Sequence, residues 1–539
     1  MTEPRKTPAA LVLPALLALI VPLAAACTET GGSGDGETVV IGTTDTLAAG
    51  NGTLAPLDPA SAYDINSWNV LTNTMQGLLR LPRTGGEPEP DAARECRFVD
   101  KRSSQFRCWL RPGLEFSNGH ELTAQDVKYS VDRVLRINAP QGPVGLLANI
   151  DTVETPSSQE VVFHLKSPDA TFPLKLATPA AAIVDSAEYP KAKLREGFEV
   201  GGSGPYTVEV ERRGSEAAKL VFTRNEGYEG SVEHRNDKVE LRVFQDAGAM
   251  EKALDDGDIQ VINRTLEPAQ LAALRDGADP DLQFVETPST GIRYLVFNMN
   301  LPVSEELGVR RAVAQLVDRK KLVRNVYRGA GSPLYSMIPR GVLGHSTAFF
   351  DAYGTPSVPK AAAFLADAGV KTPVPLTLDY TTDHYGAATE REFQELKAQL
   401  EASGLFDVTL RGTEWATFAR GLRSDRYAVS GLGRFPDFPD AEAYVAPFVG
   451  PGNQNATGNH YRNTAIEERL GAGRQQSERD RVTSSFDRIQ DILAQDVPVL
   501  PLWQGTDVIV AAPTVSGAEW ALNSSSVLQM WQLRRGPHE

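Results

Sequence analysis

The chain has 539 residues, and its 41% hydrophobic and 23% charged content is that of an ordinary globular protein. This length exceeds what one hydrophobic core usually supports, so two or three domains are expected. The formal net charge of -15 argues against nucleic-acid binding, because that function needs a positively charged face.

The first 26 residues have the pattern of a secretory signal peptide. Arg5 and Lys6 make the start positive, an apolar run extends from about residue 9 to residue 26, and small residues precede Cys27. A Cys at this place resembles the lipidation site of bacterial lipoproteins, so we predict that Cys27 carries a lipid anchor. The alternatives are a plain signal peptide with a nearby Cys and, less favoured because two prolines interrupt a short run, a transmembrane helix.

Residues 28–37 (TETGGSGDGE) are small and polar, so residues 27–37 are predicted to be a lipidated Cys followed by a flexible tether. Loss of residues 1–26, which carry Arg5, Lys6 and Glu3, changes the net charge from -15 to -16. The expected mature protein is therefore an acidic globular body held at the extracytoplasmic face of the bacterial cell membrane.

The two remaining cysteines, Cys96 and Cys108, lie in the stretch ECRFVDKRSSQFRCWL, where two short runs flank a polar turn. An antiparallel hairpin would place them opposite each other. Outside the cytoplasm such a pair usually forms a disulfide, and we predict one here. Two separate buried thiols are the alternative.

Strands alternate with helices along two separate stretches of the chain, which predicts two α/β lobes. In the stretch 110–135 (LRPGLEFSNGHELTAQDVKYSVDRVL), Thr123 and Asp126 indicate a helix start, and apolar residues then recur on one face. Other expected strands are 37–44, 293–300 and 428–435, and expected helices are 305–328 and 478–495, the latter preceding PVLPLW (498–503). The segment 62–81 is expected to be a helix leading into a turn, and 201–210 a Gly-rich turn into a strand. Helix–strand units are expected at 247–262, 359–380 and 389–410.

Signatures of catalysis and of cofactor binding are absent from the sequence. The seven His residues are scattered without metal-ligand spacing, and there is no Cys-x-x-Cys. A Walker loop, a dinucleotide-binding glycine motif and a Gly-x-Ser-x-Gly elbow are also missing. We therefore expect a protein that is not an enzyme and that holds no metal and no cofactor.

The stretch 110–135 closely resembles the signature region of the family 5 extracellular solute-binding proteins, the peptide-, oligopeptide- and nickel-binding receptors of ABC importers. The resemblance continues in chain order over essentially the whole mature chain. Further matching segments are NTMQGLLRL (73–81), GSGPYTV (202–208), NEGYEG (225–230), 296–323, KAAAFLADAGV (360–370), GRFPDFPDAEAY (433–444) and DVPVLPLW (496–503).

The resemblance implies an α/β, two-lobed periplasmic-binding-protein-like fold of type II, with a subdomain inserted in lobe I and the ligand cleft between the lobes. It places the main part of lobe I at 38–80, 161–287 and 496–539, the inserted subdomain at 81–160 and lobe II at 288–495.

The implied function is a solute-binding receptor, expected to be a monomer, that captures short peptides or a related small solute by lobe closure and delivers them to ABC permease subunits. The alternative is a lipoprotein sensor that reports peptide binding without import.

In peptide-binding relatives, an Asp in the segment that matches 433–444 holds the α-ammonium group of the peptide. The frequent pattern Ala-Asp-Tyr-Pro-Asp-Pro-Asp reads Arg-Phe-Pro-Asp-Phe-Pro-Asp here, so Phe435 occupies the Asp position. Asp437 and Asp440 are the candidate ligands nearby. This departure leaves recognition of a free amine open.

Other candidate ligand contacts follow from the same resemblance and from positions near strand ends. Core packing is the alternative for the aromatic residues, and capping or solvation is the alternative for the polar ones. These candidates are Tyr63, Asn66, Trp68, Asn298, Asn300, His384, Trp415 and Trp503. Dipeptide receptors place an Arg where this chain has residues 383–385, and no Arg is present there, so dipeptide specificity is not supported.

Overall fold

The computed structural model describes Met1 and residues 38–49, 55–83, 85–140, 142–277, 279–450 and 457–536. The predicted signal peptide, Cys27 and the tether lie outside these residues. The chain divides into two compact units, Met1–Gly36 and Glu37–Glu539, and the fold described below is that of the second.

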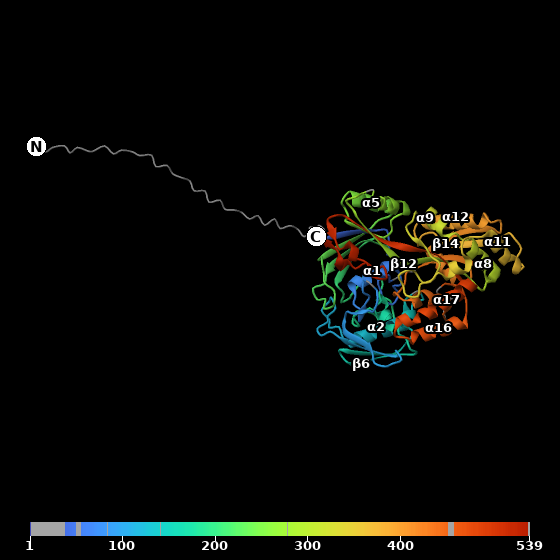
Figure 1. The fold of residues 1–539 in the computed structure, drawn as a ribbon. Helices are drawn as coiled ribbons and strands as arrows, with labels where there is room; N and C mark the ends of the chain where they lie inside the picture. Colours follow the sequence, from blue (N-terminus) through green and yellow to red (C-terminus); the bar gives the residue numbers. More distant parts are fainter. Residues whose placement is uncertain are drawn as a thin grey trace. The chain divides into compact units, whose positions relative to one another are not determined.

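One large mixed sheet connects two α/β lobes (Figure 1). Its strands follow the order β15-β14-β16-β12-β17-β11-β1-β10-β9-β8, and β13 pairs with β17. The strands are β1 (Val39–Thr43), β8 (Tyr206–Arg213), β9 (Glu216–Arg224), β10 (Lys238–Val243), β11 (Val261–Asn263), β12 (Gln283–Phe297), β13 (Ser332–Pro333), β14 (Val374–Thr381), β15 (Phe406–Thr413), β16 (Val429–Arg434) and β17 (Val499–Ala511).

Strands β12 and β17 run through both lobes and pair with each other on both sides of an irregularity at residues 288–292. They are therefore the hinge strands of the molecule. Strands β1 and β11 run parallel to β12, toward lobe II, whereas β14 and β16 run antiparallel to it, toward lobe I. The carboxyl ends of the central strands in the two lobes consequently face each other.

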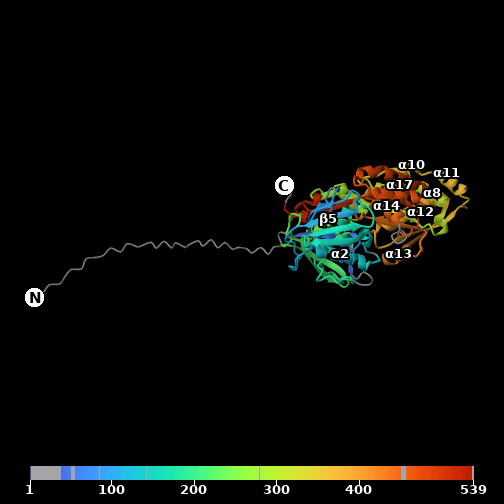
Figure 2. The same cartoon turned by 90° about the horizontal axis from the view of Figure 1, so that it is seen from below.

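Helices cover both faces of the sheet in each lobe, with α1 and α5 in lobe I and α8, α9, α11, α12 and α17 in lobe II (Figures 1 and 2). The helices outside the inserted segment are α1 (Ile65–Thr74), α4 (Phe172–Leu176), α5 (Ala247–Asp255), α6 (Pro268–Arg275), α7 (Pro302–Glu305), α8 (Leu307–Leu316), α9 (Arg319–Tyr327), α10 (Ala348–Tyr353), α11 (Val358–Asp367), α12 (Ala388–Glu401), α13 (Trp415–Leu422), α14 (Ala441–Val449), α16 (Thr464–Arg474) and α17 (Thr483–Asp496).

A separate four-stranded antiparallel sheet, β4-β5-β7-β6, begins in the region predicted as an inserted subdomain (81–160) and extends past its end, because β7 starts at Glu160. Its elements are β4 (Ala93–Phe98), β5 (Gln105–Leu110), α2 (Ala124–Ile137), α3 (Val144–Leu147), β6 (Ile150–Ser157) and β7 (Glu160–Leu165). Short pairs complete the fold: β2 (Leu79–Arg80) with β3 (Glu89–Pro90), and β18 (Val515–Ser516) with β19 (Arg534–Arg535).

Cys96 and Cys108 lie directly opposite each other on β4 and β5 and form the predicted disulfide. In the neighbouring helix α2, the Asp126 carboxylate accepts hydrogen bonds from the backbone N–H of Thr123 at 3.0 Å and from its hydroxyl at 2.8 Å. The predicted helix start is confirmed, since α2 begins at Ala124.

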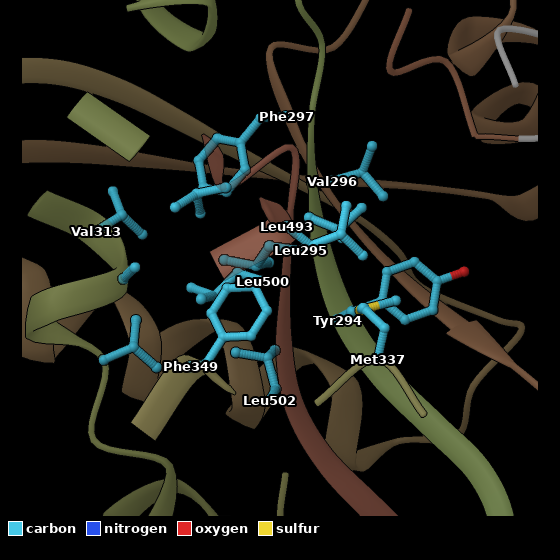
Figure 3. Packing of buried hydrophobic residues seen from close by; sticks show 14 of the residues in the cluster. Tyr294, Leu295, Val296, Phe297, Val313, Met337, Phe349, Leu493, Leu500 and Leu502 are labelled. Atoms are coloured by element: carbon cyan, nitrogen blue, oxygen red, sulfur yellow. The ribbon is translucent and has the colours of Figure 1, made fainter. Parts of the chain in front are cut away.

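The lobe II core is built from both hinge strands and the helices around them. Tyr294, Leu295 and Phe297 from β12 and Leu500 and Leu502 from β17 are buried in it (Figure 3). Burial of such large side chains stabilises each by about 1.5–3 kcal/mol relative to exposure. The hinge strands are thus anchored within lobe II, and motion between the lobes has to occur at residues 288–292.

One predicted helix is wrong in extent. The helix expected at 305–328 is broken, because the Asp318 side chain accepts a hydrogen bond from Lys321 N–H at 3.0 Å and begins a new helix, α9. The helix leading into a turn that was expected in 62–81 is confirmed, and the helix α1 ends at Thr74. There the glycine turn 202–204 packs against it, and a Cβ at Gly202 would lie 2.2 Å from the Thr74 carbonyl oxygen.

Candidate ligand site between the lobes

Side chains from the facing strand ends of the two lobes meet in one place. Asp45 follows β1 and Arg264 follows β11 in lobe I, while His384 follows β14 and Phe435 follows β16 in lobe II. The Arg264 guanidinium lies over the Phe435 ring at 5.1 Å from its centroid. Ligands of open α/β sheets bind outside the carboxyl ends of strands, which is the position of these residues. We call the set Asp45, Tyr63, Arg264, His384, Trp415 and Phe435 the interlobe site.

Aromatic rings form much of the interlobe site. His384 stacks on Trp415 with centroids 3.9 Å apart and an interplanar angle of 5°. Tyr63 and Phe435 are 40% and 38% exposed, unusually high fractions for large aromatic side chains in the interior of a two-lobed protein. Exposed rings from both lobes can stack on a ligand held between them.

The His384 ring keeps accessible surface but lies among groups of both lobes. This enclosure is the main cause that lowers the pKa of His384 to about 4. Repulsion by the charges of Arg293 and Arg264 lowers the pKa further, whereas the charge of Asp383 raises it. The imidazole is therefore neutral near pH 7 in this structure.

The two predicted carboxylates are already engaged by protein groups. Asp437 is only 7% exposed and pairs with Arg434 at 2.7 Å. Asp440 accepts the Glu442 N–H at the start of α14 and two hydrogen bonds from Arg479, each 2.8 Å long. The role of Asp437 and Asp440 as anchors for a ligand amine stays a prediction.

Trp68, Asn66 and Trp503, which were also predicted to contact the ligand, lie in three different environments. Trp68 is buried, and its indole N–H donates to the Ala62 carbonyl at 3.0 Å. Asn66 donates to the Thr46 carbonyl at 3.2 Å, beside the interlobe site. Trp503 lies in the hinge strand β17 and packs on Tyr327 with centroids 4.0 Å apart.

Asn298 and Asn300 are not brought to the interlobe site. Both amides donate to Asp425, at 2.9 Å and 3.2 Å, and His460 contacts the same carboxylate at 2.7 Å. The reason is the strand direction, because β12 runs away from lobe I and its carboxyl end lies on the far side of lobe II.

Arginines at the interlobe site are the functional candidates that sequence reasoning missed. Arg264 and Thr265 both have left-handed backbone conformations, with φ of 63° and 61°, a strained arrangement that directs the loop after β11. Arg293 lies in β12 with its guanidinium 4.1 Å from the Tyr385 ring centroid. Neither Arg is part of a motif, so their positions follow only from the fold.

The lobes touch on both sides of the interlobe site. Arg391 of α12 forms an ion pair with Glu267 of lobe I at 3.1 Å, and the Ala170 N–H donates to the Arg474 carbonyl at 2.7 Å. Trp68, Leu146 and Leu174 of lobe I share an apolar cluster with Phe438 and Ala443 of lobe II. These contacts define a closed conformation.

A cavity of about 1070 Å³ also lies between the lobes. It is lined by the edge of the inserted segment, the segment 518–526, lobe II segments 340–343 and 477–480, and alternate residues of the hinge strands. Of the ten predicted ligand residues, all of them described, only Asp440 lines it. The other nine predicted ligand residues lie outside its lining.

The described residues contain neither a metal-binding cluster nor a membrane-spanning helix. No group of three or more His, Cys, Asp or Glu side chains among them is arranged to hold a metal ion. Across the same part of the chain, no helix combines the length and the apolar character needed to cross a membrane.

Two α/β lobes, two hinge strands and aromatic and charged groups facing each other at strand ends define a binding protein that encloses a small molecule by lobe closure. The chain belongs to family 5 of the bacterial extracellular solute-binding proteins, whose family model matches residues 87–456.

Relatives and solved structures agree with this family. The chain is 25% identical over 463 residues to the probable D,D-dipeptide-binding periplasmic protein DdpA of Escherichia coli (strain K12), covering 83% of this chain and 86% of that protein. It is 24% identical over 486 residues to di/tripeptide-binding protein 3 of Pseudomonas aeruginosa (strain UCBPP-PA14), covering 84% and 88%. The solved structure of AgaA with agropinic acid, from A. tumefaciens R10, is 20% identical, with a TM-score of 0.79 and coverage of 93% and 99%.

Proposed function

We propose that this protein captures short peptides, or a related small solute, between its lobes and delivers them to the membrane permease of an ABC importer. The observation that supports this function best is the meeting of strand carboxyl ends from both lobes, with Arg264 of lobe I lying over Phe435 of lobe II. Peptide-binding relatives of similar length, which the chain covers almost completely, support the choice of ligand.

The proposal includes a signal peptide at residues 1–26, a lipid anchor on Cys27 and a monomeric body. An anchored receptor stays near its permease, and a ligand that bridges both lobes shifts the open–closed equilibrium toward the closed form. Closure requires no chemical change in the ligand, so the protein acts as a receptor and not as an enzyme.

Native mass spectrometry of the purified protein tests the ligand class. We expect heterogeneous added masses that dissociate into short peptides, because roomy, hydrated pockets tolerate different side chains. A ligand-free sample prepared by unfolding and refolding should regain these masses when it is mixed with a peptide digest. A single saccharide or a chelated metal in the purified sample would contradict the peptide assignment.

A further inference from the structure

We propose that the interlobe site recognises a carboxylate of the ligand through Arg264 and Arg293, and that a free α-ammonium group is not required. This inference rests on the proposed function and names the ligand class that the site accepts. It follows from hydrogen-bond donors that no protein group satisfies and from carboxylates that protein groups already occupy.

Four polar side chains around the hinge have buried donor atoms without a hydrogen-bond partner among the described residues. These atoms are Nη1 of Arg264, Nη1 of Arg293, Nε1 of Trp503 and Oγ1 of Thr506. A buried donor without an acceptor costs about 1–3 kcal/mol, more for a charged group, so such groups are rarely left unpaired. A ligand that brings acceptor oxygens would satisfy them.

The four donor side chains belong to residues on strand β17 or to residues paired with it. Arg293 and Trp503 are direct cross-strand partners on β12 and β17, and Thr506 follows three residues later on β17. The backbone N–H of Arg264 donates to Val508 of the same strand at 3.2 Å. Both arginines contact aromatic rings at the interlobe site. Arg264 lies over Phe435, and Arg293 lies over Tyr385, whose ring centroid is 4.6 Å from that of His384.

The acidic groups nearby leave Nη1 of each arginine without a hydrogen-bond partner. Asp45 approaches Arg264 only at 3.5 Å, and burial raises the pKa of Asp45, which favours its uncharged form. Glu392 approaches Arg293 at 3.4 Å but also accepts a hydrogen bond from the Tyr327 hydroxyl at 2.5 Å. A planar guanidinium with free N–H groups is well suited to bind a carboxylate.

An α-ammonium group of a ligand would need a carboxylate, and Asp437 and Asp383 already have partners within the protein. Phe435 stands where peptide-binding relatives carry the anchoring Asp, and the Asp437 carboxylate is paired with Arg434 at 2.7 Å. Asp383 accepts the Trp415 N–H at 2.7 Å and the Thr381 hydroxyl at 3.0 Å. At Asp437 a ligand amine would have to displace Arg434, and displacement of a buried pair is costly.

The experiment compares one library of di- to pentapeptides in four forms: unmodified, N-acetylated, C-amidated and modified at both ends. Bound peptides are identified by affinity selection and mass spectrometry, and affinities of the selected peptides are measured by calorimetry. We expect amidation to weaken binding at least about tenfold, the equivalent of roughly 1.4 kcal/mol, and acetylation to change it less than about threefold.

Three variants complete the test. Arg264→Gln should weaken the binding of peptides that have a free C-terminal carboxylate and remove their higher affinity relative to the amidated peptides. Trp503→Phe should have the same effect, but a smaller one. Arg275→Gln is the matched control, because Arg275 lies on the neighbouring helix α6 and pairs with Glu286. Unlike Arg293, Arg264 and Arg275 both lie outside the core strands, so their variants should fold normally.

The outcomes separate this inference from the proposed function. If peptides bind and acetylation harms them more than amidation does, the carboxylate proposal is overturned while the peptide receptor stands. Equal affinities for the acid and amide forms also overturn it. Failure of all four libraries to bind removes the proposed function and the carboxylate proposal together.

Discussion

At the scale of single residues, we expect protonation of His384 to oppose lobe closure. It stacks on Trp415 within lobe II, while Arg264, which disfavours its protonation, belongs to lobe I. When the lobes separate, Arg264 moves away and the ring gains solvent, so the pKa of His384 should return toward its ordinary value of about 6.5. The pKa is then lower in the closed form than in the open form.

Ligand affinity should therefore fall as the pH decreases from about 6.5 to about 4. In this range the open form binds a proton at His384 and the closed form does not, so acidification favours opening. Because the ring is partly exposed, the effect should be several-fold at most. Calorimetric titration of a bound peptide at pH 7.5 and pH 5 measures it.

His384→Gln should flatten this part of the pH dependence, because glutamine does not titrate. His164→Gln is the control, since His164 lies on β7 of the inserted sheet, away from the interlobe site. An unchanged pH profile in the His384 variant would reject the assigned role.

At the scale of elements, helix α2 is attached to the main part of lobe I by a buried ion pair. Arg133 donates to both carboxylate oxygens of Asp58 at 2.7 and 2.6 Å, and the two side chains are 1% and 0% exposed. Arg133 also donates to the Pro190 and Lys193 carbonyls. The segment 110–135, which resembles the family signature, thus serves to dock the inserted subdomain.

Arg133→Met should lower the free energy of unfolding by about 3–5 kcal/mol, because it leaves the Asp58 carboxylate buried without its partner. Urea denaturation followed by circular dichroism measures the change. Arg136→Met on the same helix is the control, since Arg136 is exposed, and it should have little effect.

The double variant Asp58→Asn with Arg133→Met should recover part of the loss, because no buried charge then remains. If Arg133→Met were no more destabilising than Arg136→Met, the docking role of this pair would be refuted.

At the scale of the whole molecule, an ion pair, a hydrogen bond and an apolar cluster hold the two lobes against each other. The Arg391–Glu267 pair and the apolar cluster around Phe438 join the lobes, and β12 and β17 run through both of them, with an irregularity in their pairing at residues 288–292. Such a hinge allows the lobes to separate without loss of either core.

Small-angle X-ray scattering should show a larger radius of gyration for the ligand-free protein than for the protein saturated with a selected peptide. The change should disappear on addition of a peptide form that does not bind. Superimposable curves with and without a tightly bound peptide would contradict closure.

Much of this architecture could be predicted from local sequence. The capped start of α2, the helix–Gly–strand unit 247–262 and the opposed Cys96 and Cys108 all depend on neighbouring residues. The break between α8 and α9 was missed because apolar periodicity continues across it, while the Asp318 cap interrupts the backbone hydrogen bonds. Periodicity reports which face is buried, not where the helix stops.

The sequence by itself determined the family, the two-lobed class and the segments that reach the strand ends, because these depend on patterns among residues close in the chain. Only the tertiary structure decided which side chains meet. Strand direction sends Asn298 to the far side of lobe II and brings Arg264 and Arg293 to His384. Contacts between residues so distant along the chain depend on how the strands pair, and no local pattern records that pairing.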